Sequence, residues 1–236
     1  HTGITAIRDF NLHIAPGQKV AVIGRTGAGK STLAQLLIRM YDPQEGKVMV
    51  DEEDVRYLQL SDLRGQISYV PQDVFLFSDS IANNIRFGDP SASLQAVQTA
   101  ARQASVEKDI LGFNEGFDTA IGERGVTLSG GQKQRISIAR ALIKDPDILI
   151  FDDCLSAVDA RTEKEIIGNL YAYLKNKTAI IITHRIFALF EFDKIIVLDE
   201  GRIVEEGTHE DLLSLNGYYA ELYTRQQTGE DEGITE

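Results

Sequence analysis

The segment Gly24–Ser31 reads glycine, four further residues, then Gly-Lys-Ser, and the residues on its two sides differ in character. Before it, Val20–Ile23 is a continuous apolar run that predicts a buried strand. After it, apolar side chains recur at helical spacing through Ser31–Met40, which predicts a helix. A glycine-rich turn between a strand and a helix lets backbone N–H groups converge on an anion, and the helix adds its positive end. The segment therefore predicts a phosphate-binding loop.

Two side chains of this loop supply the chemistry that the pattern implies. Lys30 can reach the β- and γ-phosphates of a nucleotide, and the Ser31 hydroxyl can bind magnesium. The alternative is an ordinary glycine-rich turn with a surface lysine. It is the weaker interpretation, because the segment matches the phosphate-loop pattern completely and lies between a predicted strand and a predicted helix. We predict ATP and Mg²⁺ as cofactors, with the nucleotide bound at Gly24, Arg25, Thr26, Gly27, Ala28, Gly29, Lys30, Ser31 and Thr32.

A second ligand-binding feature is the apolar run Ile148–Phe151, which predicts a central parallel strand and is followed by Asp152 and Asp153. Open α/β sheets place their ligands at the carboxyl ends of strands. Asp152 is predicted to support magnesium, through water because Mg²⁺ keeps much of its hydration shell. Two solvated loop acids are the alternative, and the phosphate loop in the same chain favours the magnesium interpretation.

Other apolar runs of strand length predict more of the sheet. They lie at Lys47–Val50, Ile67–Val70, Thr178–Ile182 and Ile195–Leu198, and Ile4–Ile7 is also strand-like. Glu200-Gly201 predicts a hairpin turn, and Thr208 predicts the cap of a final helix.

The stretch from Ser80 to Lys144 differs, because helix formers cluster in it and β-branched runs vanish. Asp89 is a candidate helix start, and Gly130–Ile143 predicts another helix. We therefore predict an α/β fold with a mainly parallel sheet, a small N-terminal antiparallel β part and an inserted α-helical subdomain. The predicted limits are a core at 1–79 and 146–227, a helical subdomain at 80–145 and a mobile acidic tail at 228–236.

Composition narrows the class of protein. The 236 residues suffice for one substantial domain, and no apolar run approaches the ~18 residues typical of a transmembrane helix. A net charge of −12 argues against nucleic acid as a partner, because such proteins need cations to displace counterions. Cys154 follows a predicted core strand, so we interpret it as a small buried residue rather than a reactive thiol.

The segment Leu128, Ser129, Gly130, Gly131, Gln132 resembles the signature motif of ABC ATPases, the ATP-binding cassette proteins. In that family the phosphate loop of one domain holds the nucleotide and the signature motif of a second domain covers it. The resemblance implies a RecA-like phosphate-loop NTPase core, ATPase activity and pairing with a second nucleotide-binding domain.

Three more segments match the family's motifs in order. Gln72 resembles the Q-loop glutamine, which touches magnesium and the attacking water. Ser156–Asp159 resembles the D-loop, which crosses the dimer interface. His184 resembles the switch histidine that contacts the γ-phosphate. Taken alone, Gln72 would be interpreted as an ordinary loop residue and His184 as a structural histidine. Because the motifs follow the family order along almost the whole chain, we interpret both as site residues.

The resemblance extends to exporters of the family. Ser80–Ile85 resembles a stretch near which coupling helices of the membrane domain dock, and Gly122–Gly125 resembles the exporter X-loop. The aromatic residue that stacks on adenine in these exporters would precede His1, and a membrane domain would lie upstream. We therefore expect an excised domain from the cytoplasmic face of the cell membrane, with its own and a partner's transmembrane domains as further partners.

Asp153 departs from the family pattern, which has glutamate there as the base that polarises the attacking water. A catalytic base must lie within about 2.6–3.2 Å of the proton it takes, and a misplacement near 1 Å can cost on the order of 10²-fold in rate. The shorter Asp153 implies a weak site, as in one subunit of heterodimeric exporters whose partner carries the glutamate. The resemblance implies catalytic roles for Asp153, His184 and Gln72. It implies metal-binding roles for Ser31, Gln72 and Asp152.

Two alternatives to a transport motor stay open at this stage. One is a soluble ABC ATPase without a membrane domain, and the other is an ATP-dependent regulatory module without useful turnover. The acidic balance and the exporter-like segments favour the transporter.

Overall fold

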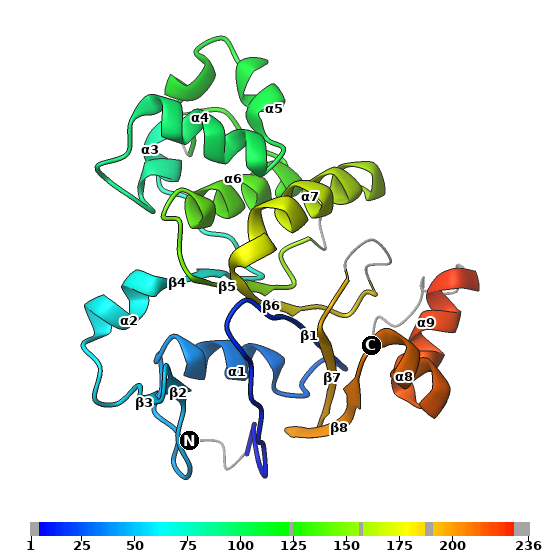
Figure 1. Cartoon of the computed structure of the whole chain (residues 1–236). Helices are drawn as coiled ribbons and strands as arrows, with labels where there is room; N and C mark the ends of the chain where they lie inside the picture. The colour runs from blue at the N-terminus through cyan, green and yellow to red at the C-terminus, as the bar shows by residue number, and fades with distance from the viewer. Residues whose placement is uncertain (1–4, 123–124, 156–157, 187–190, 229–236) are drawn as a thin grey trace. The chain divides into compact units, whose positions relative to one another are not determined.

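The computed structural model describes residues 5–122, 125–155, 158–186 and 191–228, and its elements are shown in Figure 1. The chain forms two compact units. The first contains residues 1–63 and 178–236, and the second contains residues 64–177.

The first unit is built on parallel strands. Strand β1 (Lys19–Gly24) pairs in parallel with β6 (Thr178–Ile182) and with β7 (Lys194–Asp199). The turn at Glu200-Gly201 then returns the chain as β8 (Arg202–Gly207), antiparallel to β7. A small separate sheet, β2 (Met49–Val50) with β3 (Glu53–Asp54), is antiparallel. The apolar runs predicted as strands at Val20–Ile23, Thr178–Ile182 and Ile195–Leu198 are confirmed, and so is the hairpin.

Helices of the first unit surround these strands. They are α1 (Lys30–Leu37), α8 (His209–Leu215) and α9 (Tyr218–Thr228), while α2 (Leu60–Gln66) leads into the second unit. Leu212 of α8 and Tyr219 of α9 are buried against Ile23 and Val197 of the sheet. Thr208 caps α8 in a capping box with Asp211, as predicted.

The second unit combines two strands with most of the helices, which are drawn green to yellow in Figure 1. Strand β4 (Ile67–Val70) pairs in parallel with β5 (Ile148–Asp152), which confirms both predicted strands. The helices are α3 (Ile81–Arg86), α4 (Leu94–Gln103), α5 (Glu107–Leu111), α6 (Gly130–Leu142) and α7 (Ala160–Tyr173), with short 3₁₀ turns η1 (Gly116–Asp118) and η2 (Leu174–Asn176). Helix α6 packs against α3, α4 and β4, so it is the centre of this unit.

Four local predictions were wrong in detail. Helix α4 starts at Leu94 behind the cap Ser93, because the Asp89 carboxylate instead accepts the N–H and hydroxyl of Ser91 and closes a turn. The helix predicted to reach Met40 ends at Leu37, since Arg39 adopts a left-handed φ of 50°. Only Met49–Val50 of the strand predicted from Lys47 forms. Residues 5–7 form no strand; the chain there runs past the β7–β8 turn, where Arg8 N–H donates to Gly201 O at 2.9 Å.

Candidate functional site

The phosphate loop Gly24–Ser31 joins the end of β1 to the start of α1. Two of its glycines are required by close approach of the backbone. A Cβ on Gly24 would collide with the Leu198 carbonyl of β7, and a Cβ on Gly29 would collide with the Ala6 carbonyl. Gly29 is also the N-cap of α1, with a left-handed φ of 102°. The sequence therefore folds into the strand–loop–helix arrangement that the pattern predicted.

The start of α1 is open to an anion. Within the described residues, no N-cap side chain bonds the first turn of α1, and that turn carries no acidic residue. Its N–H groups carry the positive end of the helix dipole. The Lys30 ammonium donates to Gly24 O at 2.7 Å and to Arg25 O at 2.9 Å, so it lies folded over the loop. Arg25 itself lies over the Tyr218 ring of α9, with 5.4 Å from guanidinium carbon to ring centroid.

His184 belongs to the same unit as the phosphate loop. Val22 of β1 and Ile182 of β6 are register partners. Gly24 lies two residues after Val22, and His184 lies two residues after Ile182. Both therefore lie at the carboxyl ends of neighbouring parallel strands, where ligands bind in such sheets. His184 is exposed, and its neighbour Arg185 is tied back by an N–H bond of 2.9 Å to the Thr183 hydroxyl.

The acidic pair occupies the end of β5 in the second unit. Asp152 is 2% exposed, and its Oδ2 accepts the Tyr69 hydroxyl of β4 at 3.0 Å. Burial, with the charge and hydrogen bond of Asp152, raises the pKa of Tyr69, so the phenol stays a donor. Asp153 has a left-handed φ of 47°, a conformation that aspartate adopts more readily than most residues. Gln72 lies exposed beyond the adjacent strand, at the same carboxyl edge.

Cys154 follows this pair and is a buried free cysteine. It is 2% exposed, and burial raises its pKa well above the ordinary value, with Asp153 adding to the effect. The prediction of a small buried cysteine is confirmed.

The signature segment forms the first turn of α6. Ser129 Oγ accepts Gln132 N–H at 3.2 Å, and Gln132 Oε1 accepts Ser129 N–H at 3.0 Å, a complete capping box. Leu128 is buried and anchors the segment, whereas Ser129 and Gly130 are exposed. The turn is thus held by its own hydrogen bonds and by buried Leu128, and it exposes Ser129 and Gly130.

Asp159, the end of the D-loop-like segment, caps α7. Its Oδ1 accepts Thr162 N–H at 3.0 Å and Arg161 N–H at 3.1 Å. Ser156 and Ala157 of that segment, and Glu123 and Arg124 of the X-loop-like segment, lie outside the described residues.

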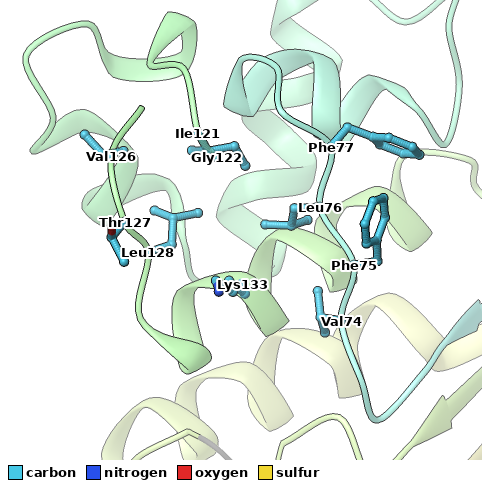
Figure 2. Close-up of a pocket in the computed structure, with 10 residues that line it drawn as sticks. All are labelled: Val74, Phe75, Leu76, Phe77, Ile121, Gly122, Val126, Thr127, Leu128 and Lys133. Atoms are coloured by element: carbon cyan, nitrogen blue, oxygen red, sulfur yellow. The ribbon is translucent and has the colours of Figure 1, made fainter. Parts of the chain in front are cut away.

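A pocket opens beside the signature segment (Figure 2). One wall is the chain after Gln72, and the other is the chain that leads to Leu128. Phe75 and Phe77 line the first wall, with ring centroids 5.1 Å apart, and Phe75 is 68% exposed. The lining consists of Val74, Phe75, Leu76, Phe77, Ile121, Gly122, Val126, Thr127, Leu128 and Lys133. This is an apolar, accessible surface with one lysine.

Sequence reasoning missed two side chains that touch the predicted site residues, Tyr69 on Asp152 and Asp109 on Gln132. Tyr69 lay within the predicted strand Ile67–Val70, but only the pairing of β4 with β5 brings it to Asp152. Asp109 carried no signal, because an acidic residue in a short helix is ordinary.

These features define a phosphate-loop nucleotide-binding protein with an exposed signature segment. The family model described as ABC transporter matches residues 7–156, and the chain belongs to that family, whose members are ATPases that bind ATP, usually with Mg²⁺. The chain has the mixed α/β fold of the family, with a mostly parallel sheet, a small antiparallel sheet and a helical insert, as predicted.

Relatives match nearly the whole chain. An ATP-dependent lipid A-core flippase of Alkalilimnicola ehrlichii is 50% identical over 94% of the chain and 38% of its own length. An iron-sulfur clusters transporter, atm1, of Neurospora crassa is 43% identical over 96% of the chain and 33% of its own length. The solved structure of a bacterial Atm1-family ABC exporter with ATP bound superposes with a TM-score of 0.90 at 44% identity, covering 94% of the chain and 39% of that chain. The chain thus spans about a third of the length of these relatives. Within the described ranges, no helix has both the length and the apolar character needed to cross a bilayer.

Proposed function

We propose that this chain is the ATP-binding domain of an ABC exporter, of the type to which the Atm1-family structure belongs. It couples ATP binding and hydrolysis, in a dimer with a second nucleotide-binding domain, to transport across a membrane. One observation carries the proposal: the same chain holds an anion-ready phosphate loop and an exposed, rigidly capped signature turn. In this proposal it works at the cytoplasmic face of the cell membrane, with core 1–79 and 146–227 and helical subdomain 80–145.

The residues present fit MgATP. The uncapped start of α1 and Lys30 provide positive charge for the phosphates. Ser31, Gln72 and Asp152 provide hard oxygen donors, and Mg²⁺ bound to a nucleotide needs only one or two carboxylates beside phosphate oxygens. When bound, the metal neutralises charge on the phosphates. His184 contacts the γ-phosphate, and Asp153 and Gln72 orient the attacking water.

The exposed signature turn and Asp159 serve the partner's nucleotide. The capping box satisfies the start of α6 within the turn itself. The stability of α6 therefore does not explain why Ser129 and Gly130 are exposed. Their exposure supports a role for Leu128–Gln132 as a surface that meets a second domain. That domain is an ABC nucleotide-binding domain, and nucleic acid is not a partner.

The aromatic pocket supports the link to a membrane domain. Phe75, Phe77 and Phe87 form an exposed aromatic group, with the Arg140 guanidinium 5.6 Å from the ring centroids of Phe77 and Phe87. In this proposal, coupling helices of the transmembrane domains dock here, next to both Gln72 and the signature turn. The relatives' names differ in cargo, which fits a motor that does not touch the cargo itself.

Asp153 stands where the family has a glutamate, which is one methylene longer. We propose that its shorter side chain gives this chain's own site weak hydrolysis, and that the partner domain is a different subunit with a catalytic glutamate. A homodimer whose Asp153 reaches the water through a backbone shift is the competing arrangement.

Binding of MgATP tests the proposal at its base. Lys30→Ala removes the cation from the phosphates and is expected to weaken MgATP binding at least about tenfold. Isothermal titration of the chain with MgATP measures this, and Lys164→Ala, at an exposed lysine of α7, is the control. Unchanged ATP affinity and turnover in Lys30→Ala would refute the nucleotide site.

A further inference from the structure

The side chain of Gln132 has two ends with two partners. Its Oε1 accepts Ser129 N–H at 3.0 Å, which closes the capping box. Its Nε2 donates to Asp109 Oδ1 at 3.0 Å. A flipped amide would place Oε1 against a carboxylate and the NH₂ group against the Ser129 N–H, which is unfavourable at both ends. The carboxylate of Asp109 therefore selects the orientation of the amide that caps Ser129.

Asp109 is itself held on its other side. It lies on α5, 23 residues before Gln132, and its Oδ2 accepts Arg135 Nη1 at 2.7 Å. Arg135 also donates to Ser105 O at 2.6 Å and to Gly131 O at 3.3 Å. The guanidinium thus joins the chain ahead of α5 to the signature turn, and the Asp109 carboxylate lies between two signature-helix donors.

The electrostatics favour a charged Asp109. Burial raises its pKa, but the hydrogen bonds from Gln132 and Arg135 and the charge of Arg135 together outweigh burial and lower the pKa. An ionised carboxylate is a full acceptor at both oxygens, so it accepts from both donors at once.

We propose that Asp109 is a positioning residue of the signature motif: it holds the Gln132 amide, and through the capping box Ser129, in the arrangement that meets the partner's nucleotide. This rests on the proposed function, in which Ser129 contacts that nucleotide. Asp109 touches no nucleotide and acts only through Gln132. Arg135 and Asp109 together make the outward face of the turn depend on α5.

Exchanging the carboxylate at position 109 with the amide at position 132 tests whether their hydrogen bond orients the cap on Ser129. In Asp109→Asn, the oxygen of the introduced amide is taken by Arg135 and its NH₂ group faces Gln132, so the Gln132 amide flips and the cap on Ser129 is lost. Gln132→Glu alone sets two carboxylates against each other. In the double variant, the carboxylate introduced at position 132 accepts both from the amide introduced at position 109 and from Ser129 N–H, so the network is restored. Each single change should be harmful and the pair should recover, which separates positioning from a general loss of stability.

The first measurement is amide hydrogen exchange of Ser129 by NMR on this chain, which needs no turnover. We expect exchange to be faster by about tenfold in each single variant and to return to the wild-type rate in the double variant. Glu107→Gln is the matched control, since Glu107 lies on the same helix and pairs with Arg102 at 2.8 Å, away from the signature turn. Unchanged Ser129 exchange in Asp109→Asn overturns the proposal.

The second measurement is ATP turnover of the full-length protein, with Ser129→Ala in parallel. We expect Asp109→Asn to lower kcat about tenfold with unchanged KM for ATP, and the double variant to recover most of the loss. If Ser129→Ala loses turnover while Asp109→Asn keeps it, the positioning role is wrong and the proposed function stands. If both variants keep full turnover, the proposed function itself fails.

Discussion

At the scale of single residues, the hydrogen bond from Tyr69 orients the carboxylate of Asp152, the predicted magnesium-binding residue. Asp152 is almost fully buried, and buried polar groups need hydrogen-bond partners. The Tyr69 hydroxyl is such a partner, because it donates to Asp152 Oδ2 at 3.0 Å. In the proposed magnesium site, a hydrogen-bond partner of this kind fixes the orientation of the metal-binding carboxylate.

Tyr69→Phe removes that donor without changing the ring. We expect the Mg²⁺ concentration needed for half-maximal ATP binding to rise by about tenfold, because Asp152 loses its fixed orientation. Titration of ATP binding against Mg²⁺ measures this. Tyr173→Phe is the control, because its hydroxyl contacts Asp145 Oδ1 at the same 3.0 Å away from the predicted site residues. Equal Mg²⁺ dependence in the two variants would exclude the role of Tyr69.

At the scale of elements, α9 is attached to the sheet of the first unit by its first turn. The Glu205 carboxylate of β8 accepts Tyr218 N–H at 2.5 Å and Tyr219 N–H at 3.2 Å. An anion at a helix N-terminus is favourable for the dipole and satisfies N–H groups that have no intrahelical acceptor. Tyr218 also lies under Arg25 of the phosphate loop, so this cap positions a neighbour of the nucleotide-binding residues.

Glu205→Gln keeps the shape but removes the charge from the start of α9. We expect the free energy of unfolding to fall by about 1 kcal/mol, as measured by urea denaturation. Glu206→Gln, one residue further along β8, breaks only an exposed ion pair with Lys194 at 2.7 Å and should cost about half of this or less. A larger loss in Glu206→Gln than in Glu205→Gln would contradict the capping role.

At the scale of the whole molecule, the proposed dimer has two unequal sites. In the proposed arrangement, the ATP site to which Asp153 belongs is the weak one, and the signature turn of this chain closes the partner's productive site. We therefore expect Asp153 and the signature turn to contribute differently to turnover, although both belong to one chain.

This asymmetry predicts different effects of two substitutions in the intact transporter. Asp153→Asn should change total ATP turnover less than about twofold, since most of the chemistry takes place at the other site. Ser129→Ala should lower turnover by about tenfold or more, because it removes a γ-phosphate contact from the productive site. Steady-state ATPase assays compare them. Loss of turnover in Asp153→Asn as complete as in Ser129→Ala would support the homodimer instead.

Local patterns in the sequence were sufficient to predict several strands of this protein and the Thr208 cap, but not the helix caps Ser80, Ser93, Ser129 and Asp159. The phosphate loop, the apolar runs of β1, β4, β5 and β6, and the Thr208 cap depend on residues close together in the chain, so periodicity and glycine content reveal them. Where two local options competed, the pattern failed: the Asp89 carboxylate was equally suited to a helix start and to a turn, and the turn formed.

The sequence by itself determined the kinds of residue available at the predicted site: a phosphate loop, an acidic pair after a buried strand, and a signature segment, whose capping box only the structure revealed. Tertiary structure decided which other side chains orient them. Tyr69 and Asp152 are 83 residues apart, and only the parallel pairing of β4 with β5 brings them into contact. Asp109 reaches Gln132, 23 residues further along the chain, only because the fold brings α5 within hydrogen-bond distance of the first turn of α6. Such contacts depend on how elements pack, which no short-range periodicity encodes.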